Sequence, residues 1–238
     1  MSLVELNNIS HAYGTKSVIN DLSLSMEANQ LTCLLGSSGC GKTTILRLIA
    51  GLEKPASGEI IIDNKTVSKK EEIVILPQNR ATGMIFQDLA LWPHFTVYKN
   101  IAFGLTERKE KQIKERVNEV LTFFGLTEHA NKYPHQLSGG QKQLVAIARS
   151  LVLKPKILLM DEPLANLDVK LKRKILDHIS SLIKEFNLTI VYVTHDHKEA
   201  FAIADKVVVL NEGKVEEEGT VQQIKESKNE YVKFFLEY

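Results

Sequence analysis

The stretch GSSGCGKT, from Gly36 to Thr43, matches the pattern G-x-x-x-x-G-K-[ST] at every fixed position. The glycines let the backbone curl so that successive N–H groups point inward at phosphate oxygens. Lys42 adds a mobile cation for outer phosphates, and Thr43 offers a hydroxyl to Mg²⁺. The stretch predicts a nucleoside triphosphate site with magnesium, the alternative being a glycine-rich turn before a helix. The expected binding residues are Gly36, Ser37, Ser38, Gly39, Cys40, Gly41, Lys42, Thr43 and Thr44.

The segments around this loop indicate an α/β fold with a mostly parallel central sheet. Short apolar runs without alternation are typical of parallel strands covered on both faces. Leu3–Ile9 and Val18–Met26 alternate instead and predict an N-terminal antiparallel β subdomain. From about Ile85 to Gln136 helical periods dominate, which predicts an inserted helical subdomain. The expected central strands are Leu31–Leu35, Ile157–Met160, Thr189–Val193 and Val207–Leu210, and helices are expected at Thr44–Ala50, 113–124, 142–152 and 171–186.

Composition limits the class of protein. The chain has 238 residues with 44% apolar content, enough for one large α/β domain and against disorder. A net charge of +1 gives no bulk attraction to nucleic acid, so no nucleic-acid partner is expected. No run approaches the ~18 apolar residues of a membrane span, and the first ten residues do not resemble a signal peptide. Cys33 and Cys40 are expected as reduced thiols, as in the cytosol.

The segment ILLMDE, Ile157–Glu162, places two acids at the end of a predicted buried strand. Ligands of open parallel sheets bind at the carboxyl ends of the strands. Asp161 could hold Mg²⁺ through water, and Glu162 could polarise an attacking water. The alternative is a strand that ends in two exposed acids, but the phosphate loop and the abrupt stop at Pro163 favour the functional interpretation.

The segment LSGGQ, Leu137–Gln141, precedes a predicted helix. Ser138 and Gln141 have the spacing of a capping box, which is the purely structural interpretation. Capping does not require the two glycines between them, Gly139 and Gly140. Exposed N–H groups at a helix N-terminus would make a second anion site, so the sequence suggests a nucleotide shared between two surfaces.

The ordered series GSSGCGKT, LSGGQ, ILLMDE and a histidine after the next strand resembles the signature of ABC-transporter ATPase subunits over essentially the whole chain. The resemblance implies a P-loop NTPase fold, a single cassette over residues 1–238 with a helical subdomain at roughly 88–152, ATP and Mg²⁺ as cofactors, and ATP hydrolysis. Tyr13 would stack on adenine, with a surface aromatic as the alternative. The implied catalytic residues are Glu162, His195, Gln87 and Lys42, and the implied metal ligands are Thr43, Gln87 and Asp161.

The same resemblance implies a head-to-tail homodimer in which Ser138, Gly139, Gly140 and Gln141 of one copy close the site of the other. Asn166–Asp168 resembles the D-loop of the family, although Ala165 stands where Ser is usual. Taken singly, Gln87 and His195 also suit a loop amide and a strand-end histidine.

The stretch LWPHFTVYKNIAFGL, Leu91–Leu105, resembles importer-type cassettes that serve sugars, polyamines, iron(III) and oxyanions. It implies a peripheral protein at the cytoplasmic face of the membrane, contacting permease subunits near Trp92–Phe95 and a substrate-binding protein indirectly. A core role for Trp92 is equally open. The tail KNEYVKFFLEY resembles the segment before a regulatory domain, and no such domain is expected within the chain.

Two other classes remain open. A soluble ABC ATPase of DNA repair or translation would tend to have two cassettes or a long coiled-coil insert, and neither is seen in the sequence. A regulatory module without hydrolysis is disfavoured by Glu162 and His195. We further expect the Cys40 thiol to border the nucleotide and to react readily, because Lys42 and the helix N-terminus favour a thiolate.

Overall fold

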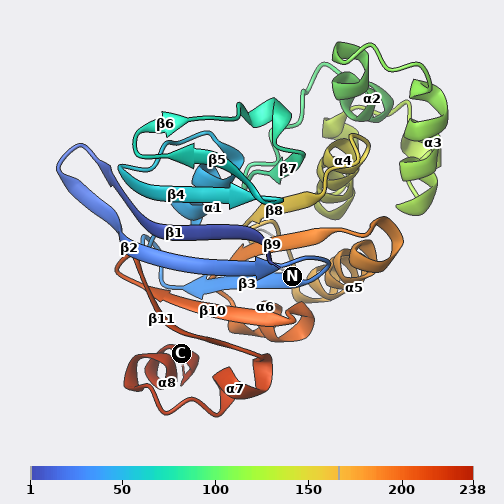
Figure 1. Cartoon of the computed structure of the whole chain (residues 1–238). Helices are drawn as coiled ribbons and strands as arrows, with labels where there is room; N and C mark the ends of the chain where they lie inside the picture. Colours follow the sequence, from blue (N-terminus) through green and yellow to red (C-terminus); the bar gives the residue numbers. More distant parts are fainter. Residues whose placement is uncertain (1, 166, 238) are drawn as a thin grey trace.

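The computed structural model describes residues 2–165 and 167–237 and contains two sheets (Figure 1). The first sheet is antiparallel and has the order β2-β1-β4-β5-β6. The long hairpin at the N-terminus forms the β2 side of this sheet, and three short strands form the other side. Its strands are β1 (Ser2–Tyr13), β2 (Lys16–Glu27), β4 (Ser57–Ile62), β5 (Lys65–Lys69) and β6 (Glu72–Ile73).

The second sheet has the order β11-β10-β3-β9-β8-β7, and all its neighbouring pairs are parallel except β10 with β11. Parallel neighbours need long crossover connections, and helices supply them here. The strands are β3 (Leu31–Gly36), β7 (Thr82–Ile85), β8 (Ile157–Asp161), β9 (Thr189–Thr194), β10 (Lys206–Asn211) and β11 (Lys214–Gly219).

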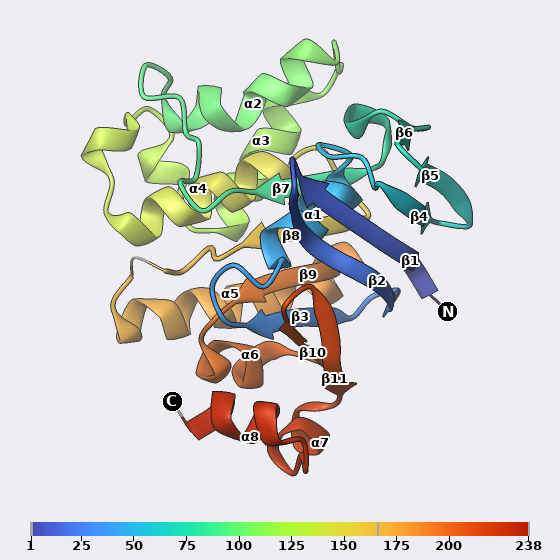
Figure 2. The ribbon, with the colours of Figure 1, turned by 90° about the vertical axis from the view of Figure 1, so that its left-hand side faces the viewer.

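Helices cover the mostly parallel sheet. Helix α1 lies between the two sheets, whereas α2 and α3 lie at one end of the molecule and α7 and α8 at the other (Figures 1 and 2). The helices are α1 (Lys42–Ala50), α2 (Val97–Glu107), α3 (Ile113–Phe123), α4 (Gly139–Leu151), α5 (Val169–Phe186), α6 (His197–Ile203), α7 (Val221–Lys225) and α8 (Glu230–Glu237). Short 3₁₀ turns occur at Pro77–Asn79, Thr127–His129 and Pro134–Gln136.

The two faces of the mostly parallel sheet are buried in different cores. Leu34, Leu159 and Val191 pack with α1 and the antiparallel sheet. Cys33 and Leu158, on the opposite face, pack with residues of α2 to α6. Both faces are therefore apolar, which is why these strands show no alternation in sequence.

The predicted fold class is confirmed, including the four central strands, the antiparallel β subdomain and the helices inserted between β7 and β8. The strands β4 to β7 and β11 were not predicted from the sequence. These strands are short, and β11 (KVEEEG) is an acidic edge strand without an apolar pattern. No helix in the described part of the chain is long and apolar enough to span a bilayer.

Arg80 is a buried charge that ties the antiparallel sheet to α1. Its side chain is only 3% exposed, and burial lowers its pKa to about 10. The guanidinium donates to the carbonyls of Leu48 and Ile49 at the C-terminal end of α1, where a cation also complements the helix dipole. Its other acceptors are the carbonyls of Ile75 and Val67 and the hydroxyl of Ser68.

We expect Arg80→Met to lower the free energy of unfolding by about 3 kcal/mol or more, because several buried carbonyls would lose their donor at once. Urea unfolding monitored by circular dichroism would measure the change. Arg108→Met is the matched control, because Arg108 is exposed and should change stability by less than about 0.5 kcal/mol. Equal stability of the two variants would contradict this role of Arg80.

Candidate functional site

The sheet register brings three loops to one edge. Leu35 of β3 pairs with Thr194 of β9, and Asp161 of β8 pairs with Val193 of β9. The strands are parallel, so the chain leaves all three at the same edge. The phosphate loop, the acidic pair and His195 therefore emerge side by side, as expected for a ligand site of an α/β sheet.

The loop between β3 and α1 has the geometry of a phosphate cradle. Gly41 has φ +106°, and a Cβ there would lie 2.5 Å from the Ile19 side chain. Lys42 is 4% exposed, and its Nζ donates to the carbonyls of Gly36 and Ser37, both at 2.8 Å. The ammonium is thus held over the loop, beside the N–H groups of the first turn of α1. A backbone cradle with a fixed cation fits the phosphates of a nucleotide.

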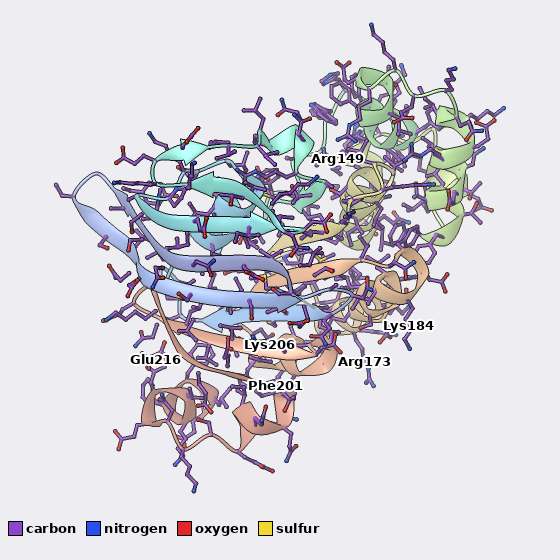
Figure 3. All side chains as sticks on the ribbon, viewed as in Figure 1. Arg149, Arg173, Lys184, Phe201, Lys206 and Glu216 are labelled. Carbon is purple, nitrogen blue, oxygen red and sulfur yellow. The ribbon has the colours of Figure 1, made fainter. Side chains whose placement is uncertain are left out.

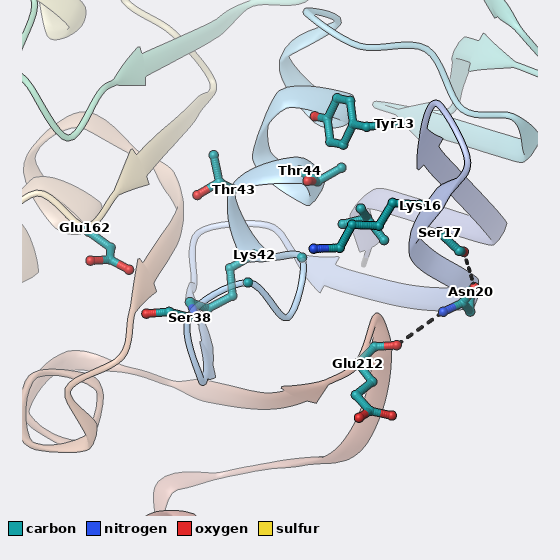
Figure 4. A pocket seen from close by; sticks show the side chains of 13 residues that line it. Tyr13, Lys16, Ser17, Asn20, Ser38, Lys42, Thr43, Thr44, Glu162 and Glu212 are labelled. Carbon is teal, nitrogen blue, oxygen red and sulfur yellow. Dashed lines mark hydrogen bonds between the residues drawn. The ribbon is translucent and has the colours of Figure 1, made fainter.

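A cavity of about 600 Å³ opens beside this loop (Figure 4). Glu162 lies on one side of the loop, and Lys16 and Glu212 lie on the other. This volume suits a nucleotide-sized ligand. The lining residues are Tyr13, Lys16, Ser17, Val18, Asn20, Ser38, Gly39, Gly41, Lys42, Thr43, Thr44, Glu162 and Glu212.

Thr43 and Asp161 form a pair suited to a hard cation. The Thr43 hydroxyl donates to Oδ1 of Asp161 at 2.8 Å. Burial raises the pKa of the Asp161 carboxyl above its ordinary value, although the hydrogen bond from Thr43 opposes this shift. Hydroxyl and carboxylate oxygens are the ligands that Mg²⁺ prefers. Among the described residues no cluster of three His, Cys, Asp or Glu side chains is placed to hold a metal ion, so Mg²⁺ here would need further oxygens, as a phosphate supplies.

Glu162 lines the cavity and contacts His195, which lies beside it. His195 Nδ1 lies 3.1 Å from Oε2 of Glu162. Glu162 has φ +43°, an uncommon value for a residue with a side chain, and its N–H donates to Val193. This left-handed backbone turns the carboxylate away from β8 and toward the cavity.

Tyr13 stands at the rim of the cavity with 43% of its surface exposed. His11 meets it edge to face, with the ring centroids 4.8 Å apart. The Tyr13 hydroxyl donates to Glu53 at 3.4 Å. These contacts fix the ring and leave it accessible for a flat ligand.

Several predicted residues lie outside the lining of this cavity, namely Gly36, Ser37, Cys40, Gln87, Asp161 and His195. Gln87 is exposed just after β7, beside the end of β8 because Ile85 pairs with Met160. His195 contacts Glu162 but lines a separate hollow with Phe234 and Phe235 of α8. The predicted D-loop is described only in part, because Asn166 lies outside the described residues.

The signature residues also lie away from the cavity, at the start of α4. Ser138 accepts from the backbone N–H of Gln141, and the Gln141 side chain accepts from the N–H of Ser138, so the capping box is present. A Cβ at Gly140 would lie 2.6 Å from the side chain of Leu171 on α5. Close packing therefore gives a structural reason for one of the two glycines that capping leaves unexplained.

The expectation of a reactive Cys40 is wrong. The Cys40 side chain is buried and packs in the core with α1 and the antiparallel sheet, and it does not line the cavity. Burial raises its pKa, and this effect outweighs the charge of Lys42, whose Nζ lies 3.8 Å from the sulfur. Both cysteines are free.

Sequence reasoning missed one wall of the cavity. Lys16, Ser17 and Asn20 come from the β1–β2 hairpin, and Glu212 comes from the β10–β11 turn. The Asn20 side chain donates to the carbonyl of Glu212. Gly213 joins the same turn to the phosphate loop, since its N–H donates to Cys40 and its carbonyl accepts from Asn20. The sequence NEGK at 211–214 is typical of a turn and could have predicted the β10–β11 turn, but it does not indicate a ligand site.

Trp92 belongs to a half-buried aromatic cluster with Phe95 and Phe103. The Trp92 and Phe103 ring centroids are 4.4 Å apart, and the Arg149 guanidinium lies 4.9 Å from the centre of the indole. Arg149 comes from α4 and also donates to the loop before Trp92 (Figure 3). Asn100 is fully buried and hydrogen-bonds the backbone of Trp92 and Phe95. The hydrogen bonds of Asn100 thus hold the backbone of the cluster in place, and its aromatic side chains are partly packed against one another and partly exposed to solvent.

Known proteins match the chain at the level of sequence. The family model described as "ABC transporter" matches residues 19–165. The "Fe(3+) ions import ATP-binding protein FbpC" of Photorhabdus laumondii is 44% identical over 99% of this chain and 66% of the relative. The "Spermidine/putrescine import ATP-binding protein PotA" of Haemophilus ducreyi is 42% identical over 99% and 63%. The chain therefore spans about two thirds of the length of these relatives.

A solved cassette matches the fold. The dimeric structure of MJ0796, a bacterial ABC transporter cassette, has a TM-score of 0.81 at 33% identity, over 92% of this chain and 98% of the other. Its post-hydrolysis state bound to ADP and Pi has a TM-score of 0.79 at 32% identity, over the same shares. The family model covers more than half of the chain, and sequence, fold and site geometry agree with it. The chain belongs to the ABC transporter family.

Proposed function

We propose that this chain is the ATP-hydrolysing subunit of an importer. The observation that supports this most directly is the meeting of Lys42, the Thr43–Asp161 pair and Glu162 at one cavity. The two relatives are named as import ATP-binding proteins, and the matching cassette has been seen with ADP and Pi. Retained Glu162 and His195 favour hydrolysis over mere nucleotide binding.

Each residue would have a defined task. Lys42 and the first turn of α1 would neutralise the outer phosphates, and the Tyr13 ring would receive the adenine. Thr43 and Asp161 would hold Mg²⁺, which supplies charge neutralisation on the phosphates when bound. Glu162 would accept a proton from the attacking water. His195 would orient the Glu162 carboxylate through the contact at 3.1 Å, and Gln87 would complete the site from the end of β7.

Two copies would work head to tail. The signature residues Ser138–Gln141 do not line the cavity of their own chain, although α4 presents an N-terminus suited to anions. The matching cassette forms a dimer. We therefore propose that this N-terminus closes the cavity of a second copy.

The aromatic cluster of Trp92, Phe95 and Phe103 would contact a membrane permease from the cytoplasmic side, and a substrate-binding protein would act through that permease. The aromatic cluster is partly exposed and lies beside the charged Arg149, which suits a docking surface with an apolar centre. The internal contacts give Trp92 a share in local packing as well. The two interpretations of Trp92 are therefore compatible.

We expect Glu162→Gln to bind ATP normally and to lower turnover by roughly 10² or more, because the general base loses its charge. Phosphate release would measure turnover, and a fluorescent nucleotide would measure binding. Glu107→Gln, an exposed acid on α2, is the control and should keep full turnover. Near-normal turnover of the Glu162 variant would rule out this assignment.

We expect Tyr13→Ala to raise the Kd for ATP by roughly 5- to 150-fold, since stacking of a base on an aromatic side chain contributes about 1–3 kcal/mol. Tyr13→Phe keeps the ring and should bind ATP within about twofold of the original chain. Isothermal titration would measure both. If the two variants bind equally, Tyr13 does not stack on the base.

We expect Lys42→Ala and Ser138→Arg each to be inactive alone and to regain partial activity when mixed. In a head-to-tail pair of the two variants, both lesions fall in one site and the other site is intact. ATP turnover and ATP-dependent dimerisation of the mixture would be measured together. If every chain works independently, the mixture stays inactive and no pairing appears.

A further inference from the structure

Glu199 is a buried carboxylate that the proposed site does not use. It lies on α6, four residues after His195, and is only 4% exposed. The Tyr192 hydroxyl donates to Oε2 at 2.8 Å, and the Thr194 hydroxyl donates to the same oxygen at 3.0 Å. Lys172 Nζ donates to Oε1 at 2.6 Å. Both oxygens are thus satisfied, which offsets the cost of burying the charge.

The positive charge that pairs with Glu199 belongs to Lys172, in the first turn of α5. Lys172 lies on α5, and its Nζ is 3.6 Å from Asp196 as well as in contact with Glu199. Burial disfavours the charge on Lys172, but its bonds to Glu199 and Asp196 outweigh this and raise its pKa. Lys172 therefore stays charged, and α5 is tied firmly to the start of α6.

The same group fixes the backbone on both sides of His195. Thr194 Oγ1 donates to Glu199 and also accepts from the backbone N–H of Asp196 at 3.0 Å. The residues before and after His195 are thereby fixed to one carboxylate. Lys225 of α7 lies over the ring of Phe201, which belongs to the same helix, so α6 also contacts α7.

Helix α5 begins directly after Asp168, the last residue of the predicted D-loop. Asp168 caps the helix by accepting from Leu171, and its carbonyl accepts from the N–H of Lys172. A shift of this first turn would therefore move Lys172 and pull on Glu199. The path from α5 to the residues flanking His195 runs through three contacts, Lys172–Glu199, Glu199–Thr194 and Thr194–Asp196, all within one chain.

We propose that Glu199 is a positioning residue that transmits the position of the first turn of α5 to His195, through Lys172 and Thr194. The proposal rests on the proposed function, in which His195 orients Glu162 for hydrolysis. Glu199 itself does not touch the cavity, so it acts only through these neighbours. If Glu199 only stabilised the fold, a change at Lys172 would not alter the position of His195 through Glu199.

The link can be tested without turnover. The imidazole NMR signal of His195, assigned by its loss in His195→Ala, reports the position of the ring in the full chain. We expect Lys172→Met to shift this signal clearly more in the original chain than in a Glu199→Gln background, where only the longer contact of Lys172 with Asp196 at 3.6 Å remains. Lys174→Met, an exposed lysine on the same helix, should leave the signal in place. An unmoved signal, or an equal shift in both backgrounds, would overturn the proposal.

Turnover gives the second test. Glu199→Gln and Thr194→Val should lower kcat by roughly tenfold with KM for ATP within about twofold, since a small misplacement of a catalytic group can cost up to ~10² in rate. Thr194→Ser keeps the hydroxyl and should restore kcat, which also guards against a Glu199 variant that fails to fold. Unchanged kcat in Thr194→Val would overturn the proposal. Absence of turnover in the original chain would instead refute the proposed function, and the NMR test of the link would still apply.

Discussion

The parallel pairing of β3, β9 and β8 is the constraint on which the site depends. The three strands end at nearly the same level of the sheet. The loop that carries Lys42, the acid pair and His195 therefore follow at the same edge. Burial of both sheet faces holds the register, because a slip of one residue would exchange the residues of the two cores. Residues more than 100 positions apart in sequence thus act as neighbours without long loops to bring them there.

Buried polar side chains hold in place the segments that surround the mostly parallel sheet. Arg80 holds the antiparallel sheet on α1, Asn100 holds the loop of Trp92, and Glu199 holds the segment around His195. Each bonds mainly to backbone or to neutral hydroxyls, with one lysine as the exception. Such groups stabilise only one arrangement of their partners, because any other leaves buried donors or acceptors unpaired. These side chains therefore define the positions of the neighbouring segments as well as stabilising the fold.

Much of this architecture could be predicted from sequence, for a physical reason. The phosphate loop and the central strands are local patterns, since GSSGCGKT and runs such as Leu31–Leu35 encode their structure within a few residues. The wall made by Lys16 and Glu212 could not be predicted, because it exists only where two distant turns meet. The Cys40 thiol was misjudged for a similar reason, as its neighbours in the core are remote in sequence. The role of Glu199 likewise depends on Lys172, which no local pattern connects to it.

The turn at Gly213 makes the phosphate loop depend on a segment that is synthesised long after the loop itself. A Cβ at Gly213 would lie 2.2 Å from the carbonyl of Val18, so the turn fits tightly between the N-terminal hairpin and the loop. A nascent chain that has emerged only as far as α6 would lack this support, although the whole loop sequence would already be outside the ribosome. Closing contacts of such long sequence separation is slow compared with helix formation. Nucleotide would thus first meet a finished cavity late in folding, after β10 and β11 have joined the sheet, and binding would stabilise the complete fold rather than its early intermediates.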